Sequence, residues 1–186
     1  MAAEPRSVCV YCGSSEASDD AYRETARALG RLLASAGCTV VYGGGRAGLM
    51  GALAEGALAA GGRIVGVIPR FMVDLEWGHD DLTELHVVED MRTRKHEMLT
   101  RASAVVALPG GTGTLEELFE AVTLKRLGLF SGPIVIVNTR GYYDALLAQL
   151  RAAIDQRFMD AGPVAVWTVV AGPEGVLPAI DFAAIR

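Results

Sequence analysis

The stretch AVVALPGGTGTLEELFEAVTLKRLG, residues 104–128, joins a short apolar run to a helical pattern through a glycine-rich turn. The apolar run is typical of a strand that is buried on both faces, as the strands of parallel sheets are. A helix is expected to begin near Thr114, where apolar residues start to recur at helical spacing. Glycines let the backbone come close to a ligand, and the free amides and positive end of a helix attract an anion. The stretch therefore predicts a strand, a turn suited to a phosphate group, and a helix.

The same turn also has a simpler structural explanation. A threonine would cap the helix, while Glu116 and Glu117 complement the helix dipole in its first turn. The turn lacks the Gly-Lys-Ser/Thr ending of a Walker loop, which excludes that type of nucleotide motif. Taken alone, the turn does not separate phosphate binding from capping.

Strand patterns alternate with helical patterns along the chain. Strands are predicted at 7–12, 39–44, 63–69, 86–90, 104–110, 133–138 and 165–172. Helices are predicted at 20–37, 48–62, 91–102, 114–128 and 142–158, with a last short helix from Pro173 and an irregular segment at 70–85. This order predicts an α/β fold, a Rossmann-like, doubly wound parallel sheet flanked by helices, in a single domain over residues 1–186.

Small residues follow three of the predicted strands, as GSS at 13–15, GGGRAGLMG at 43–51 and PGGTGT at 109–114. Because ligands of such sheets lie beyond the carboxyl ends of the strands, the three segments are expected to meet at one crevice. The second segment loosely matches a G-x-G-x-x-G dinucleotide fingerprint. However, it follows the second strand, and no acidic residue stands about twenty positions later. Tight turns and close packing explain its glycines better than a nicotinamide site does.

Composition and charge exclude several classes of protein. The 186 residues are 51% apolar and 21% charged, as in a globular protein, and a net charge of −5 with no basic run argues against nucleic-acid binding. No apolar stretch is long enough to cross a bilayer and the start has no signal-peptide pattern, so a cytoplasmic protein is expected. Cys9 and Cys12 form a C-x-x-C on a predicted strand, where they point to opposite faces as buried thiols. No metal is expected, because His79, His86 and His96 lack ligand spacing.

The segment EDMRTRKHEM, residues 89–98, places a basic cluster at a predicted helix start. Arg92, Arg94 and Lys95 lie in its first turns, where each cation opposes the helix dipole by about 0.3–1 kcal/mol. A sequence that accepts this cost suggests an anionic partner. For the cluster alone, a solvated face paired with neighbouring carboxylates is the simpler explanation.

Two of these motifs together resemble one family. PGGTGTLEE at 109–117 is similar to the P-G-G-x-G-T-x-x-E signature of the LOG (Lonely Guy) proteins, and MRTRKHEM at 91–98 is similar to their M-x-x-R-K motif. The separation of the motifs also fits, and the segments at 13–15 and 43–51 look like the family's first two loops. The resemblance covers nearly the whole chain. It implies a phosphoribohydrolase that cleaves the bond between adenine, often N6-modified, and ribose 5-phosphate, with AMP or N6-prenylated AMP as substrate.

The resemblance also implies site residues. Arg94 and Glu117 match the family's catalytic pair. Its substrate-binding positions are matched by Glu76, Arg94, Lys95, Gly110, Gly111, Thr112, Gly113, Thr114 and Glu116. A carboxylate near the ribose would stabilise the positive charge of the transition state or activate the attacking water. Glu117 is expected to act as an anion, because the first turn of a helix favours a carboxylate.

Several details stay open at the level of the sequence. Arg94 would hold the ribose or the phosphate, or polarise the departing base. The resemblance implies no cofactor, and the short length resembles the dimeric members, so a homodimer is expected. Leu75, Trp77 and Met98 are candidates for a pocket around an N6 substituent, although core or lid packing explains them more simply.

Two other functions remain alternatives. A non-catalytic Rossmann carrier of a nucleotide or pterin cofactor would use the same glycine loops, but it would not need the pair of Arg94 and Glu117. A decarboxylase that uses pyridoxal phosphate would need a Schiff-base lysine, and the sequence contains only Lys95 and Lys125.

Overall fold

The computed structural model describes residues 6–75, 77–160 and 166–182, and its centre is one sheet of seven strands. The strands are β1 (Ser7–Tyr11), β2 (Thr39–Tyr42), β3 (Ile64–Pro69), β4 (Glu84–Val88), β5 (Ala104–Ala107), β6 (Ile134–Val137) and β7 (Thr168–Val170). They lie in the order β4-β3-β2-β1-β5-β6-β7, and each neighbouring pair is parallel. The α/β, Rossmann-like sheet that the alternating pattern predicts is therefore confirmed.

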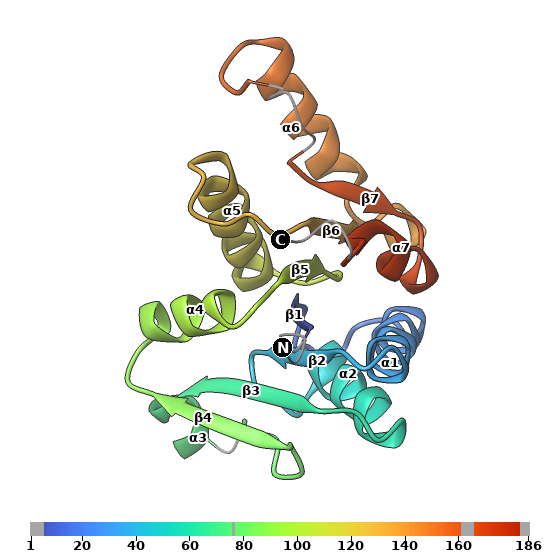
Figure 1. The fold of residues 1–186 in the computed structure, drawn as a ribbon, viewed down its shortest axis with the longest axis vertical. Coiled ribbons are helices and arrows are strands. Elements are labelled where there is room, and N and C mark those ends of the chain that lie inside the picture. Colours follow the sequence, from blue (N-terminus) through green and yellow to red (C-terminus); the bar gives the residue numbers. More distant parts are fainter. Residues whose placement is uncertain (1–5, 76, 161–165, 183–186) are drawn as a thin grey trace, which may run out of the picture.

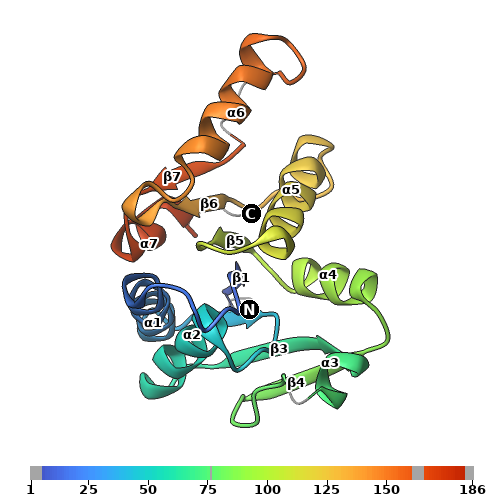
Figure 2. The same ribbon diagram turned by 180° about the vertical axis from the view of Figure 1, so that it is seen from behind.

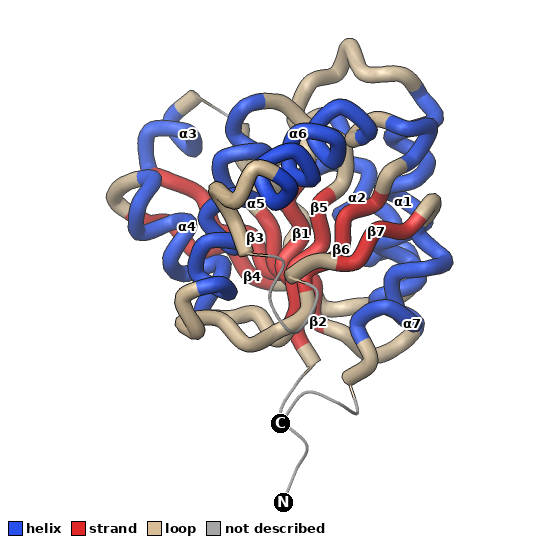
Figure 3. The backbone as a smooth tube through the Cα atoms, turned by 90° about the horizontal axis from the view of Figure 1, so that it is seen from above, coloured by secondary structure: helices blue, strands red, loops and turns tan. Residues whose placement is uncertain are grey.

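Helices lie on both faces of this sheet (Figure 1). They are α1 (Asp20–Ser35), α2 (Gly48–Ala59), α3 (Arg70–Asp74), α4 (Met91–Thr100), α5 (Thr112–Arg126), α6 (Asp144–Asp155) and α7 (Val176–Ile180), with 3₁₀ turns at Thr139–Gly141 and Pro173–Gly175. Apolar residues of α1, α2 and α7 pack into one core cluster, whereas those of α4, α5 and α6 pack into a second cluster on the opposite face. Figure 2 shows the helices from behind, and Figure 3 shows the strands running between the helices.

The strand order places a switch point next to β1. The chain adds β2, β3 and β4 outward on one side of β1 and then returns to add β5 on the other side. Because α1 and α5 cover opposite faces, the loops after β1 and β5 diverge above the sheet. In open α/β sheets the ligand lies in the crevice that such diverging loops create.

Most elements are a few residues shorter or shifted relative to the sequence prediction, and three differences have a clear structural reason. α5 begins at Thr112 rather than near Thr114, because Gly111 has extended backbone and already acts as the N-cap residue. β4 begins at Glu84, two residues earlier than predicted, because its backbone pairs with β3 from Val65 onward. The segment expected to be irregular contains the short helix α3. The first residue of the strand predicted at 165–172 lies outside the described residues.

The cysteines are arranged as predicted. Cys9 packs into the cluster under α4 and α5, and Cys12 packs into the cluster under α1 and α2, so the two side chains lie on opposite faces. Both are free thiols and buried, as is Cys38. None of the helices in the described residues combines the length and apolarity needed to cross a bilayer.

Candidate functional site

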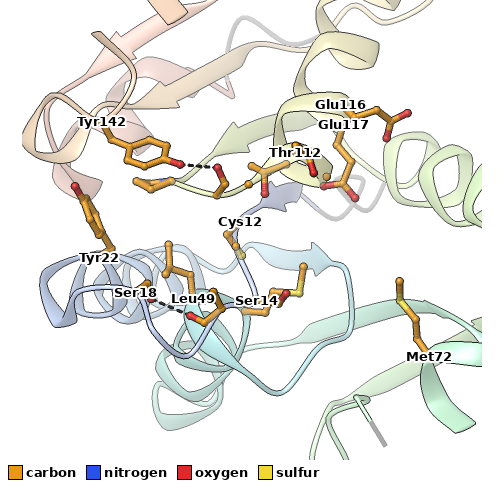
Figure 4. Close-up of a pocket in the computed structure, with 18 of the residues that line it drawn as sticks. Cys12, Ser14, Ser18, Tyr22, Leu49, Met72, Thr112, Glu116, Glu117 and Tyr142 are labelled. Carbon is orange, nitrogen blue, oxygen red and sulfur yellow. Dashed lines mark hydrogen bonds between the residues drawn. The ribbon is translucent and has the colours of Figure 1, made fainter. Parts of the chain in front are cut away.

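A cavity of about 570 Å³ opens beyond the carboxyl ends of β1 and β5. Its walls come from the loop after β1, the start of α2, the start of α5 and the side chain of Arg94. In Figure 4 Thr112 and Glu117 from α5 face Cys12 and Ser14 from the loop after β1. The cavity lies at the switch point, where the fold predicts a ligand.

Backbone contacts join the three glycine-containing loops around the cavity. The Gly13 amide donates to the Pro109 carbonyl at 3.0 Å, and the Gly13 carbonyl accepts from the Leu49 amide at 3.0 Å. Gly48 has a φ of +60°, and a Cβ there would lie 2.6 Å from the Ser14 carbonyl carbon. The three loops therefore meet as the sequence predicts. The close backbone contact at Gly48 is enough to explain the glycine at this position, without a bound dinucleotide.

The start of α5 offers free amides to the cavity. Gly111 provides no side-chain cap. The amides of Thr112, Gly113 and Thr114 have no acceptor among the described residues, whereas the Leu115 amide already donates to the Gly111 carbonyl. Such amides, with the positive end of the helix, favour an anion.

The glycines of this turn have different structural reasons. A Cβ on Gly110 would lie 2.1 Å from Thr114 Oγ1 and 2.8 Å from the Gly13 amide nitrogen, so packing within the protein requires a glycine there. A Cβ on Gly111 or Gly113 would meet nothing within 4 Å. The space beside the free amides is therefore open to a ligand.

Arg94 reaches the cavity from α4 and is anchored to the sheet. Its side chain is buried, with the residue 5% exposed. Nε donates to the Val67 carbonyl at 3.0 Å, and Nη2 donates to the Gly43 carbonyl at 2.8 Å. A Cβ on Gly43 would lie 2.0 Å from Nη2, so the glycine makes room for the guanidinium. A carbonyl of β3 and the carbonyl that follows β2 therefore hold Arg94, and Nη1 is left beside Glu117.

Glu117 lies beside Arg94 on the inner face of α5. The residue is 5% exposed, and its Oε1 lies 4.0 Å from Arg94 Nη1. Burial raises the pKa of Glu117 to about 7, although the Arg94 charge partly offsets the effect. The expectation of a fully ionised carboxylate in the first helical turn is thus wrong. Because α5 begins at Thr112, Glu117 is beyond the first turn, where the helix dipole has little effect.

Lys95 and Glu116 do not face the cavity together. Lys95 lies at the outer side of α4, where its ammonium pairs with Glu116 and, at 3.0 Å, with Glu120 Oε2. Glu116 borders the cavity, but its carboxylate is directed toward α4 (Figure 4). Arg92, the third member of the basic cluster, is exposed. Of the basic cluster, only Arg94 lines the cavity.

A second cavity of about 510 Å³ adjoins the first and shares Arg94 with it. Its walls include the apolar side chains of Met50, Ile68, Met72 and Trp77. Among the candidates for an N6-substituent pocket, Trp77 therefore lines a cavity, whereas Met98 is buried in the core and Leu75 is exposed outside it. Glu76, the remaining predicted binding residue, lies outside the described residues.

Two tyrosines at the cavity were not predicted from the sequence. Tyr22 and Tyr142 border its end away from Glu117, with their rings edge to face at a centroid distance of 5.7 Å. The Tyr142 hydroxyl donates to the Gly110 carbonyl at 2.6 Å, which supports the glycine-rich turn. Neither residue belongs to a motif or a glycine segment, so the sequence carried no signal for them.

Comparison with known proteins places the chain in a family. The family model described as "Possible lysine decarboxylase" matches residues 50–180. The chain is 43% identical over 177 residues to the cytokinin riboside 5′-monophosphate phosphoribohydrolase of Rhodococcoides fascians, covering 95% of this chain and 89% of that protein. It is 38% identical over 168 residues to the cytokinin riboside 5′-monophosphate phosphoribohydrolase LOG3 of Arabidopsis thaliana, covering 90% of this chain and 77% of that protein.

Solved structures show the same fold. The Moco carrier protein from Chlamydomonas reinhardtii superposes with a TM-score of 0.73 at 23% identity, covering 95% of this chain and 96% of that chain. At this identity the likeness concerns the fold and not the ligand.

Proposed function

The chain belongs to the LOG family, whose model is described as possible lysine decarboxylase, and we propose that it is a nucleoside 5′-monophosphate phosphoribohydrolase. It hydrolyses the N-glycosidic bond of AMP or N6-modified AMP and releases the free base and ribose 5-phosphate. The observation that carries the proposal is the buried pair of Arg94 and Glu117, 4.0 Å apart, at a cavity that also exposes the free amides of α5.

In this proposal each part of the cavity has one task. The amides of Thr112, Gly113 and Thr114 bind the 5′-phosphate, because a helix start favours an anion. Glu117 takes a proton from the water that attacks C1′, and its carboxylate faces the positive charge that develops on the ribose. Arg94 stabilises the Glu117 carboxylate and contacts the ribose through Nη1. The bond from C1′ to the base breaks, with its electron pair going to the base nitrogen, as the bond from C1′ to the water oxygen forms. The base takes up a proton, and Glu117 returns the proton it took from water to solvent, so that the charges balance.

The second cavity supports a substrate with an N6 substituent. It adjoins Arg94 and presents Met50, Met72 and Trp77, which are suited to an apolar chain. We place the N6 group there. Kinetic comparison of AMP with N6-isopentenyl-AMP would test this placement through the ratio of their kcat/KM values, and equal values for the two would contradict it.

The family description does not fit the lysines of this chain. Lys95 pairs with Glu116 and Glu120, and Lys125 donates to the carbonyls of Ser131 and Gly132. Neither lysine lines the cavity. A Schiff base with pyridoxal phosphate would need a lysine there, so these positions argue against decarboxylase chemistry.

A direct assay tests the proposed function. Purified protein is incubated with AMP or N6-isopentenyl-AMP, and free base and ribose 5-phosphate are quantified by chromatography. Equal amounts of the two products are expected. Tight binding of a nucleotide or a pterin cofactor without release of base would favour the alternative, a non-catalytic carrier.

We also propose a homodimer in the cytoplasm. Three large apolar side chains are exposed on α5 and just after it: Phe119, Leu127 and Leu129. By contrast, Leu118 and Val122 of α5 pack on the sheet. Sedimentation at several concentrations would distinguish a dimer from a monomer.

The cysteines support the proposed location in the cytoplasm. All three are free and buried, which is the usual state of cysteine thiols in a reducing compartment.

Gly43→Ala is expected to lower kcat by displacing Arg94. The new methyl group would lie 2.0 Å from Nη2, and the long side chain can move more easily than the backbone. We expect kcat to fall about 10- to 100-fold, the scale of a misplaced group at a reacting centre. The melting temperature should change little.

A double-mutant cycle gives the control for this prediction. If Gly43 acts only through Arg94, Gly43→Ala should have no further effect in the Arg94→Ala protein. An equal loss of kcat in both backgrounds would show that Gly43 has another role.

A further inference from the structure

An ion cluster joins α4 to α5 on the outside of the cavity. Lys95 of α4 pairs with Glu116 and Glu120, which are one helical turn apart on α5. The Lys95 side chain is only 17% exposed, so the ammonium is held between the helices rather than extended into solvent. Lys95 does not line the cavity.

The members of this cluster are sequence neighbours of the inner pair. Arg94 precedes Lys95 on α4, and Glu117 follows Glu116 on α5. Since adjacent residues of a helix point about 100° apart, each helix presents one charge to the cavity and the next to the outer cluster. The Arg94–Glu117 pair and the Lys95–Glu116 pair therefore connect the same turn of α4 to the same turn of α5.

The two inner groups differ in what holds them. Arg94 is fixed by the carbonyls of Val67 and Gly43. Glu117 accepts no hydrogen bond from the described residues, and its nearest cation is Arg94 Nη1 at 4.0 Å. Its position therefore depends on where α5 lies. The start of α5 borders open space at Gly111 and Gly113, and the ion pairs of Lys95 connect the next turns of α5 to α4.

From this geometry we propose that Lys95 is a positioning residue: through Glu116 and Glu120 it holds α5 so that Glu117 stays beside Arg94, and it does not touch the nucleotide. This rests on the proposed function, because the consequence is expressed in turnover. It replaces the binding role that the family resemblance implied for Lys95 and Glu116.

The charges of the cluster support the same role. Arg94 and Lys95 from α4 and Glu116 and Glu120 from α5 act on Glu117, and the titratable groups facing it from the sheet are Cys9 and Tyr11 of β1 and Cys12 just after β1. After burial, Arg94 and Lys95 lower the pKa of Glu117, whereas Glu116 and Glu120 raise it. Removal of Lys95 leaves two unpaired carboxylates near Glu117 and raises its pKa further. The activity of such a variant should need a higher pH.

Charge exchange tests the proposal. Lys95→Met is expected to lower kcat about 10- to 100-fold, to change KM for AMP less than about twofold, and to move the acid limb of the pH profile to higher pH. Lys95→Glu should be worse, because three carboxylates then meet. The double variant K95E/E116K again places one lysine between two carboxylates, and it should recover most of the lost kcat.

Arg101→Met provides the matched control. Arg101 is the C-cap residue of α4 and pairs with Glu97, and both contact His86 of β4 rather than α5. Its loss removes an ion pair of the same helix and should leave kcat and the pH profile unchanged. A melting curve for each variant verifies that the fold is retained.

Other results would overturn the proposal. A tenfold or greater rise of KM with unchanged kcat, and no recovery in K95E/E116K, would show that Lys95 binds the nucleotide. Unchanged kcat and pH profile in Lys95→Met would show that the cluster has no positioning role. If the wild-type protein releases no base, the proposed function fails. The positioning role of Lys95 is then tested by infrared titration of the Glu117 carboxyl. An unchanged pKa of Glu117 in the Lys95→Met protein would contradict that role.

Discussion

Replacing Glu117 by Gln is expected to abolish most turnover while AMP binding is retained. The amide cannot accept a proton from water, and the loss of a general base costs about 10²- to 10⁴-fold in kcat. The amides of α5 that bind the phosphate are unaffected, so Kd for AMP should change little. Product release and calorimetric binding measure the two quantities. Near-normal turnover would show that Glu117 is not the base, and Glu174→Gln, at an exposed site, provides the control.

The same variant is expected to be more stable than the wild type at neutral and alkaline pH. Burial raises the pKa of Glu117 from 4.5 to about 7, so the folded protein binds this proton more tightly than the unfolded chain does. Its contribution to stability is present at low pH and is lost as the pH rises between these two values. The glutamine variant avoids this loss and should gain about 1–3 kcal/mol, or about 2–10 °C in melting temperature, above pH 7.

The pH series separates this cause from a general effect of the substitution. The difference in melting temperature should shrink toward zero as the pH falls to about 4.5. A difference that does not depend on pH would mean that Glu117 titrates normally in the folded protein.

The pH dependence of wild-type activity should follow the titration of Glu117. If the carboxylate form is required, kcat/KM rises as the pH approaches 7 and then levels off. The phosphate of the substrate titrates near pH 6, so its contribution needs a separate measurement. Binding of AMP to Glu117→Gln over the same pH range supplies it. A flat profile down to pH 5 would contradict the role of Glu117.

Gly113→Ala is expected to weaken AMP binding at least tenfold without harm to the fold. A Cβ at Gly113 meets no protein atom within 4 Å, but it would enter the open space next to the free amides. Alanine also favours the helix over glycine by about 0.5–1 kcal/mol. The melting temperature should therefore stay equal or rise while Kd for AMP increases.

Two comparisons make this prediction specific to the phosphate. Gly110→Ala places its methyl group against Thr114 and the Gly13 backbone, so it should lower the melting temperature as well as binding. Adenosine lacks the phosphate, and its binding should be affected far less by Gly113→Ala than that of AMP. Unchanged AMP affinity in Gly113→Ala would place the phosphate elsewhere.

The sequence predicted the convergence of loops better than the roles of single side chains. The segments after β1, β2 and β5 meet because parallel strands end at one edge of the sheet, which depends only on the order of elements. Lys95 and Glu116 lie in two separate motifs, and the family resemblance implied that each contacts the nucleotide, which stays a prediction. In the structure these side chains pair with each other across two helices, and nothing in their local pattern indicates that.

Order and periodicity along the chain therefore determined the fold class, the opposite faces of Cys9 and Cys12, and the glycine-rich helix start at the cavity. Only the tertiary structure decided that Gly43 makes room for Arg94 and that the pKa of Glu117 rises to about 7. The physical reason is the distance along the chain over which each property is determined. A helix or strand pattern arises from neighbours a few residues apart, whereas burial and charge at one atom sum over contacts from distant segments.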